Sequence, residues 1–232
     1  MNDVSQKLTI VIAFSSNYYG EMAIRLKKRL PNVKIYTFSS KDELTFERLK
    51  KISPNFVFFP HWSHLIEQDI YEHFNCVIFH MTDVPYGRGG SPLQNLVSRG
   101  IFDTKISAIQ CVKELDAGPV YLRRPLSLYG NAEEIYLRAA NIIVDMVEEI
   151  LRNNPSPIPQ DGEVIHFWRR TQQQSNISLC TAGLENLFHH IRMLDADGYP
   201  HAFLETDLFR FEFSRASLKS GRIVADVVIK EK

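Results

Sequence analysis

Hydrophobic and polar positions alternate in blocks along the chain, and the blocks predict strands and helices in turn. Apolar runs without alternation are typical of strands buried on both faces of a sheet. Residues 8–14 form such a run, and further strands are predicted at residues 33–38, 56–59, 76–79, 105–112 and 120–128. Apolar residues recur at helical spacing in residues 20–30, 44–52, 66–74, 93–98 and 132–152. Strands that alternate with helices predict an α/β fold with a mainly parallel sheet.

The composition changes at residues 153–162, where three prolines stand among Asn, Ser, Gln, Asp and Gly. This stretch indicates a loop or a boundary. Beyond it the pattern predicts a helix over residues 181–194 and two strands over residues 208–215 and 222–229. About 70 residues remain after Pro159, too few for a full second core. We therefore expect a catalytic domain over residues 1–160 and a helix and β-hairpin extension, residues 161–232, packed on it.

Composition narrows the class of protein. The 27 Lys and Arg balance the 27 Asp and Glu, which argues against a protein whose main task is gripping a phosphate backbone. No apolar run approaches the ~18 residues of a membrane span, and nothing at the start resembles a signal peptide. The three cysteines form no CxxC pair and are expected to be reduced and packed as small apolar residues. A cytoplasmic protein without nucleic-acid or membrane partners is expected.

Two side chains at strand ends are candidates for chemistry. His80 follows the strand at residues 76–79, and Asp116 stands in the turn Leu-Asp-Ala-Gly-Pro at residues 115–119. Ligands of such sheets bind at the carboxyl ends of strands, and an imidazole near a carboxylate can exchange protons near neutral pH. A single histidine at a strand end is more often structural, so the pair alone is only a candidate.

Other motifs favour simpler interpretations. The glycines at residues 87–90 match no phosphate-binding fingerprint and suit a turn that needs positive φ. His61 and His64 lack a third ligand, so no metal site is expected. No GxSxG elbow is present, which argues against a hydrolase. Trp62 and Trp168 are expected to lie in the core rather than to form a stacking platform.

Together, several segments resemble folate-dependent formyltransferases. Residues 80–92, HMTDVPYGRGGSP, resemble the family's HxSxLPxxRGxxP loop, and residues 115–119 resemble its LDxGP loop. Residues 168–171 and 191–203 resemble the RRxPEDS and IRALxxPxPGAF segments. Order and spacing match over roughly residues 8–215. The resemblance implies a Rossmann-like formyltransferase fold, 10-formyltetrahydrofolate as co-substrate and no metal.

The resemblance also implies roles for individual residues. His80 would donate a hydrogen bond to the oxyanion or shuttle the proton, and Asp116 would orient His80 and accept the proton. The bond between Val84 and Pro85 is a candidate for the cis form. The folate-binding residues would be Val84, Arg88, Gly89, Gly90 and Asp116. The acceptor substrate would be bound by Ser63, Thr82, Arg169 and Arg170.

The chain departs from the family pattern at one catalytic position. The family has Asn-x-His, whereas residues 78–80 are Ile-Phe-His. Either the missing amide is replaced by Ser63, Thr82 or a backbone N–H, or His80 and Asp116 suffice for catalysis. Thr82 also stands where the family has Ser.

The acceptor is predicted from the tail. The segment at residues 191–203, IRMLDADGYPHAF, is most similar to the corresponding segment of bacterial sugar N-formyltransferases of pseudaminic-acid-type pathways. It predicts formyl transfer to the amine of a nucleotide-activated amino sugar for cell-surface glycans, with a homodimer left open. One alternative is a methionyl-tRNA formyltransferase-like enzyme with another amine acceptor, against which the short tail and zero net charge argue. A second alternative, glycinamide ribotide formyltransferase, fits less well because that enzyme lacks this tail. A third is a catalytically inactive folate- or sugar-nucleotide-binding protein, which Ile78 suggests.

Overall fold

The computed structural model describes residues 8–16, 18–180 and 182–232. The chain separates into two compact units that interleave along the sequence. The first unit comprises Met1–Arg88, Lys105–Pro125 and Arg138–Ile165, and the second comprises Gly89–Thr104, Leu126–Leu137 and His166–Lys232.

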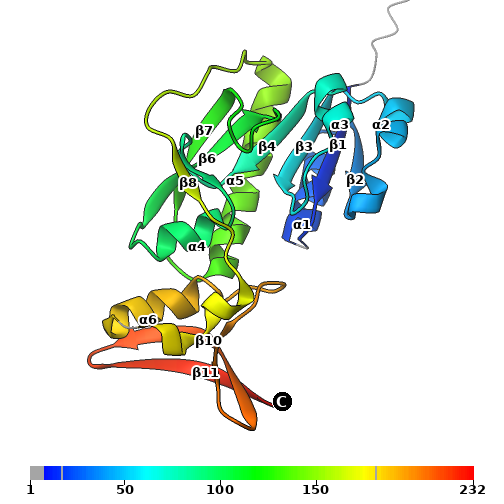
Figure 1. The fold of residues 1–232 in the computed structure, drawn as a ribbon. Coiled ribbons are helices and arrows are strands. Elements are labelled where there is room, and N and C mark those ends of the chain that lie inside the picture. Colours follow the sequence, from blue (N-terminus) through cyan, green and yellow to red (C-terminus); the bar gives the residue numbers. More distant parts are fainter. Residues whose placement is uncertain (1–7, 17, 181) are drawn as a thin grey trace, which may run out of the picture. The chain divides into compact units, whose positions relative to one another are not determined.

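The first unit is built on a six-stranded sheet of order β2-β1-β3-β4-β6-β7 (Figure 1). The strands β2, β1, β3 and β4 are parallel to one another, and β6 is antiparallel to β4. The predicted α/β fold with a mainly parallel sheet is therefore confirmed. The strand bounds are β1 (Thr9–Phe14), β2 (Lys34–Phe38), β3 (Phe56–His61), β4 (Cys76–His80), β6 (Asp103–Gln110) and β7 (Val120–Ser127).

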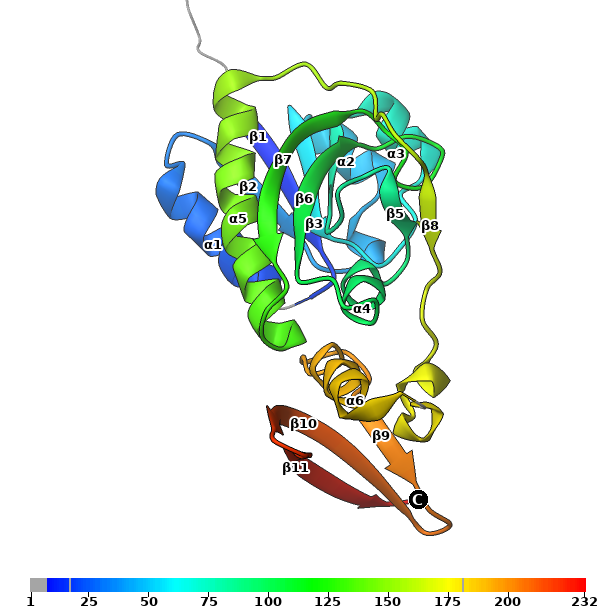
Figure 2. The ribbon, with the colours of Figure 1, turned by 90° about the vertical axis from the view of Figure 1, so that its left-hand side faces the viewer.

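Helices cover both faces of this sheet. The helices α1 (Tyr18–Arg29) and α5 (Ala132–Asn153) lie side by side on one face (Figure 2), where Arg29 pairs with Asp145 at 2.9 Å. The helices α2 (Phe46–Ile52) and α3 (Gln68–His73) lie on the other face. There Leu49 and Ile70 pack against Val11 and Val57 of the sheet. Each buried strand thus supplies side chains to two apolar layers, as the unalternating runs predict.

The second unit contains a three-stranded antiparallel sheet of order β11-β10-β9 and the helix α6 (Gly183–Arg192). The strands are β9 (Ala202–Glu205), β10 (Phe209–Lys219) and β11 (Arg222–Glu231). The predicted C-terminal hairpin is confirmed, and both of its strands run farther than predicted. Thr181, where the predicted helix began, lies outside the described residues. The short helix α4 (Pro92–Val97) also belongs to this unit.

Three short strands escaped the sequence pattern. They are β9 and the pair β5 (Tyr86–Gly89) and β8 (Ile165–Phe167), which form a two-stranded sheet. Because β5 has the sequence Tyr-Gly-Arg-Gly, its glycines indicate a turn when it is considered alone. Pairing with a distant segment makes it a strand, and local patterns do not contain that information. Three 3₁₀ turns, Lys41–Glu43, Gln172–Ser175 and Ile177–Leu179, complete the described elements.

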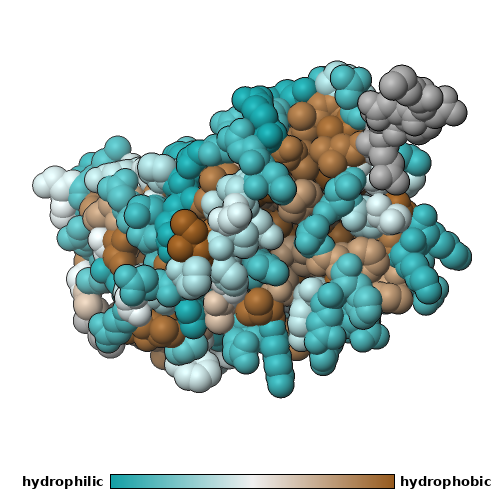
Figure 3. Space-filling view, turned by 90° about the horizontal axis from the view of Figure 1, so that it is seen from above, coloured by the Kyte–Doolittle hydropathy of each residue, from teal (hydrophilic) through white to brown (hydrophobic). Residues whose placement is uncertain are grey.

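Burial agrees with the sequence for the cysteines and differs for one tryptophan. Cys76 and Cys111 are free and buried, as predicted. Trp62 packs against the apolar cluster of the first unit, whereas Trp168 is 84% exposed, so the prediction that it lies in the core is wrong. Apolar side chains also reach the surface in patches between polar ones (Figure 3), as on most folded proteins. Among the described helices, none is long and apolar enough to cross a membrane.

Candidate active site

The structure brings His80 and Asp116 together in the first unit. His80 is the last residue of β4, and Asp116 lies in the turn between β6 and β7. The Nδ1 atom of His80 is 3.6 Å from Oδ2 of Asp116, and both side chains are only 7% exposed. Two residues that are 36 positions apart (116 minus 80) in the sequence therefore form one acid–base candidate pair.

The other ring nitrogen of His80 is already bonded. Its Nε2 atom lies 2.8 Å from the carbonyl oxygen of Gly87. A carbonyl oxygen only accepts hydrogen bonds, so Nε2 carries the proton in the neutral ring. The unprotonated Nδ1 then faces Asp116 and is the ring atom able to take up a proton.

The loop that follows His80 is held from several sides. The hydroxyl of Thr82 donates to the same Gly87 oxygen at 3.4 Å, and Ser107 donates to the carbonyl of Thr82 at 2.7 Å. Arg123 donates to the carbonyl of Val84 at 2.9 Å. The Val84–Pro85 peptide bond is cis, as the resemblance implies. Thr82 is fully buried, so its hydroxyl supports the loop.

Gln160 fixes the course of the Asp116 turn. Its Nε2 atom donates to the carbonyls of Asp116 and Gly118, each at 2.8 Å. Its Oε1 atom accepts from Nε and from a terminal nitrogen of Arg88, at 3.0 and 2.7 Å. Nothing in the sequence singles out Gln160, because it stands in the Pro-rich stretch and belongs to no recognisable motif. It connects Arg88, predicted to bind folate, to the turn that carries Asp116.

Gly118 is required by close packing. A Cβ at this position would lie 1.8 Å from the carbonyl oxygen of Gln110. No side chain fits there unless the backbone moves, which explains the glycine of the LDxGP turn.

Ile78 contributes no hydrogen-bond donor. It is half-buried and packs against Val84, Ile109 and Val120. The apolar surroundings match the apolar residue, so the side chain of Ile78 cannot supply the hydrogen bond of the family's amide.

The remaining predicted residues are divided between the units. Ser63 belongs to the first, where its backbone N–H donates to the hydroxyl of Ser15 at 3.1 Å. Gly89, Gly90, Arg169 and Arg170 belong to the second. The glycines were predicted to bind the folate, and in the structure each also lies close to the backbone of residues 167–169. A Cβ on Gly90 would lie 2.6 Å from Cα of Arg169.

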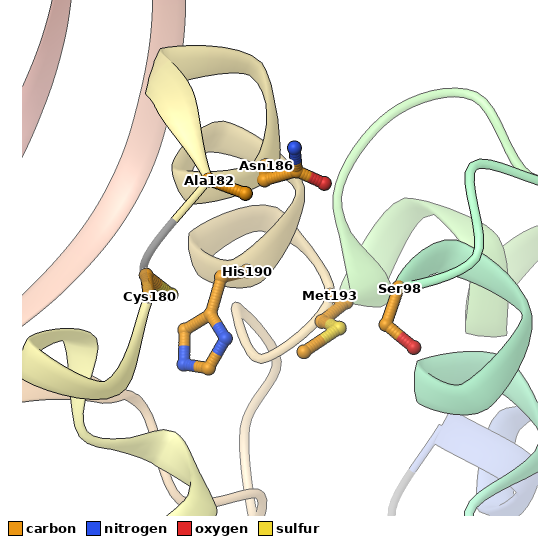
Figure 4. Close-up of a pocket in the computed structure, with 6 residues that line it drawn as sticks. All are labelled: Ser98, Cys180, Ala182, Asn186, His190 and Met193. Carbon is orange, nitrogen blue, oxygen red and sulfur yellow. The ribbon is translucent and has the colours of Figure 1, made fainter.

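A small pocket lies in the second unit (Figure 4). Its volume is about 160 Å³, and burial lowers the pKa of the His190 imidazole and raises that of the Cys180 thiol. None of the predicted site residues lines it. Over residues 8–16, 18–180 and 182–232, no group of three His, Cys, Asp or Glu is arranged to hold a metal ion. The pocket is lined by Ser98, Cys180, Ala182, Asn186, His190 and Met193.

Comparison with known proteins identifies relatives along the whole chain. Residues 172–230 match the family model described as "Methionyl-tRNA formyltransferase, C-terminal domain". The solved methionyl-tRNA formyltransferase from Clostridium thermocellum is 48% identical, with a TM-score of 0.94, over 97% of this chain and 100% of that one. The enzyme of the same name from Thermodesulfovibrio yellowstonii is 20% identical over 83% of this chain and 64% of its own length. The chain spans between about half and two thirds of the length of these curated relatives.

These findings overturn the predicted acceptor. A sugar N-formyltransferase from a Shewanella species is only 11% identical, with a TM-score of 0.66 over 95% of this chain and 97% of that one, which shows a shared fold alone. The predictions of an amino-sugar nucleotide, of a pseudaminic-acid-type pathway and of no nucleic-acid partner are therefore wrong. The tail segment does not separate the acceptor classes, and a net charge of zero is a sum that says nothing about local charge.

The formyltransferase predicted from the two loops is confirmed. The 48% identity extends over nearly all of this chain and all of the Clostridium thermocellum chain. The chain belongs to the folate-dependent formyltransferase family, the family of the methionyl-tRNA formyltransferases.

Proposed function

We propose that the chain transfers a formyl group from 10-formyltetrahydrofolate to the amino group of methionyl-tRNA. The observation that carries the proposal is the 48% identity with the Clostridium thermocellum enzyme over 97% of this chain. The match of residues 172–230 to the C-terminal domain model supports the same acceptor.

The pairing of His80 with Asp116 supports a mechanism for the transfer. An unprotonated amine attacks the formyl carbon, negative charge develops on the formyl oxygen, and the attacking nitrogen must lose a proton. With Nε2 bonded to Gly87, the proton goes to Nδ1 of His80 or to the Asp116 carboxylate. If the ring takes it, His80 becomes positively charged, and its charge stabilises the developing oxyanion. The tetrahedral intermediate then collapses: the bond between the formyl carbon and N10 of the folate breaks, and the group that took the proton returns it to N10, so that tetrahydrofolate leaves.

The donor half of the site rests on the loop between β4 and β5. Val84, Arg88, Gly89 and Gly90 remain the residues proposed to contact the folate, together with Asp116. The bonds from Arg123 and Ser107 hold this loop in one course. A fixed backbone presents its polar groups to a flat ring without a cost for ordering them on binding.

Product analysis tests the proposal directly. The purified chain is incubated with 10-formyltetrahydrofolate and methionyl-tRNA, and N-formylmethionine is measured after the ester bond is hydrolysed. Free methionine serves as the comparison acceptor and His80→Ala as the inactive control. Transfer to methionyl-tRNA that depends on His80 would support the assignment, whereas a folded chain that leaves methionyl-tRNA unformylated would refute it.

A further inference from the structure

Trp168 is exposed to an unusual degree for its residue type. Its side chain is 84% exposed. Tryptophan is highly buried on average, and it is enriched at the contact surfaces of proteins relative to the rest of the surface.

The backbone around Trp168 is held firmly within the second unit. The carbonyl of Phe167 accepts from the N–H of Gly90 at 3.0 Å, and that of Trp168 accepts from Nδ2 of Asn95 at 3.1 Å. Phe167 is buried, with the guanidinium of Arg99 4.5 Å from the centre of its ring. The indole is therefore presented to solvent from a fixed backbone.

The segments that hold Trp168 and the partners of its backbone carry positive charge only. Residues 89–102 and 164–184 contain no Asp or Glu, although the whole chain carries 27 of them. The same two segments contain Arg99, Arg169 and Arg170. Arg99 and Arg169 are exposed. Arg170 is half-buried, and its guanidinium donates to the carbonyl of Gln174 at 2.6 Å.

We infer that Trp168 is a stacking platform for an unpaired base of tRNA, with Arg169 beside it for a neighbouring phosphate. The inference rests on the proposed function and adds to it a specific contact for the nucleic acid. Unpaired RNA bases stack on aromatic rings, and arginine matches phosphate oxygens. An apolar protein surface fits less well, because Arg169 and three glutamines, at residues 172–174, follow Trp168 closely in the sequence.

Fluorescence tests the contact without requiring turnover. The chain has two tryptophans, so Trp62→Phe leaves Trp168 as the only one. Deacylated tRNA is titrated against this variant, with a fully paired RNA duplex as the comparison. Saturable quenching by tRNA, weaker with the duplex, is expected. Unchanged emission at tRNA concentrations that bind in a filter assay would overturn the inference, and so would the absence of any tRNA binding.

Substitutions test the energetic importance of the ring. Trp168→Ala is expected to weaken binding of deacylated tRNA about tenfold or more, whereas Trp168→Tyr keeps most of the affinity. Leu208→Ala is the matched control, because Leu208 is 66% exposed in the same unit but follows Glu205 and Asp207. Circular dichroism verifies folding of each variant.

The outcomes separate the two proposals. Wild-type transfer to methionyl-tRNA together with unchanged tRNA affinity of Trp168→Ala overturns the inference alone. Binding through Trp168 without formyl transfer overturns the proposed function alone.

Discussion

The Nε2 atom of His80 lies 2.8 Å from the carbonyl oxygen of Gly87, so the loop after β4 selects the tautomer of the histidine. The consequence is that only Nδ1, on the side of Asp116, is available for proton uptake by the neutral ring. The ring of His80 is thus oriented by a backbone carbonyl.

Substitution of His80 should affect the chemical step. His80→Ala is expected to lower kcat by about 10²- to 10⁴-fold, the usual contribution of a general acid or base. The KM for the folate donor should change little, because the role lies in the transition state. Steady-state kinetics measure both quantities, and single-turnover kinetics assign the loss to the chemical step. Thr82→Val removes only the second donor to the Gly87 oxygen and should reduce kcat far less; an equal loss in the two variants would argue against a proton-transfer role for His80.

Gln160 is expected to act as a positioning residue for Asp116. Gln160→Glu keeps an acceptor for Arg88 but removes the donor to the carbonyls of Asp116 and Gly118. We expect about 1–3 kcal/mol of lost stability in urea unfolding, because two half-buried carbonyls lose a partner. The value of kcat should fall while the KM for methionyl-tRNA stays near that of the wild type. Equal changes in kcat and KM would show that Gln160 supports the acceptor site instead.

The Gly118 position offers a steric test of the same turn. Gly118→Ala places a methyl group 1.8 Å from the Gln110 oxygen, so the Asp116 turn must shift. Activity should fall by at least about tenfold, since displacement of a catalytic group by ~1 Å can cost far more. Gly20→Ala is the control, because its Cβ would make only ordinary van der Waals contacts with the Phe14 ring and should stabilise α1 by up to ~1 kcal/mol. Similar activities of the two variants would contradict the steric explanation.

Stability should depend on pH through His189. Its Nδ1 accepts from Nε of Arg192 at 2.8 Å, and burial, helped by the Arg192 charge, lowers the pKa of the imidazole. The unfolded chain then binds the proton more readily, so stability is fully present above about pH 6.5 and is lost as pH falls through the folded pKa. His189→Asn keeps an acceptor for Arg192 but does not titrate. The melting temperature, measured between pH 7.5 and about pH 5, should depend less on pH in this variant than in the wild type. Part of the pH dependence should remain, because burial also lowers the pKa of His190. Superimposable profiles would exclude His189 as a contributor.

The predictable part of the protein is the part determined by local pattern. The buried parallel strands repeat apolar residues within single segments, so β1 and β4 could be placed within a residue or two at either end. His80 and Asp116 could be paired because each stands at a strand end in a recognisable loop. Gln160 could not be found, since its importance comes from two carbonyls more than 40 positions away in the sequence. The exposure of Trp168 could not be predicted either, because the residue type alone does not determine whether an indole is buried or exposed.

The second unit is built from three separate segments of the chain, so a truncated chain cannot form it completely. Arg192 donates to the carbonyls of Leu128 and Gly130, and Asn131 donates to Asp195. A fragment that ends at residue 160 keeps residues 128–131 but loses all of these partners. Chimaeras between homologues should therefore exchange residues 89–104 and 126–137 together with residues 166–232. An exchange of residues 166–232 alone would combine hydrogen-bond partners that come from two different homologues.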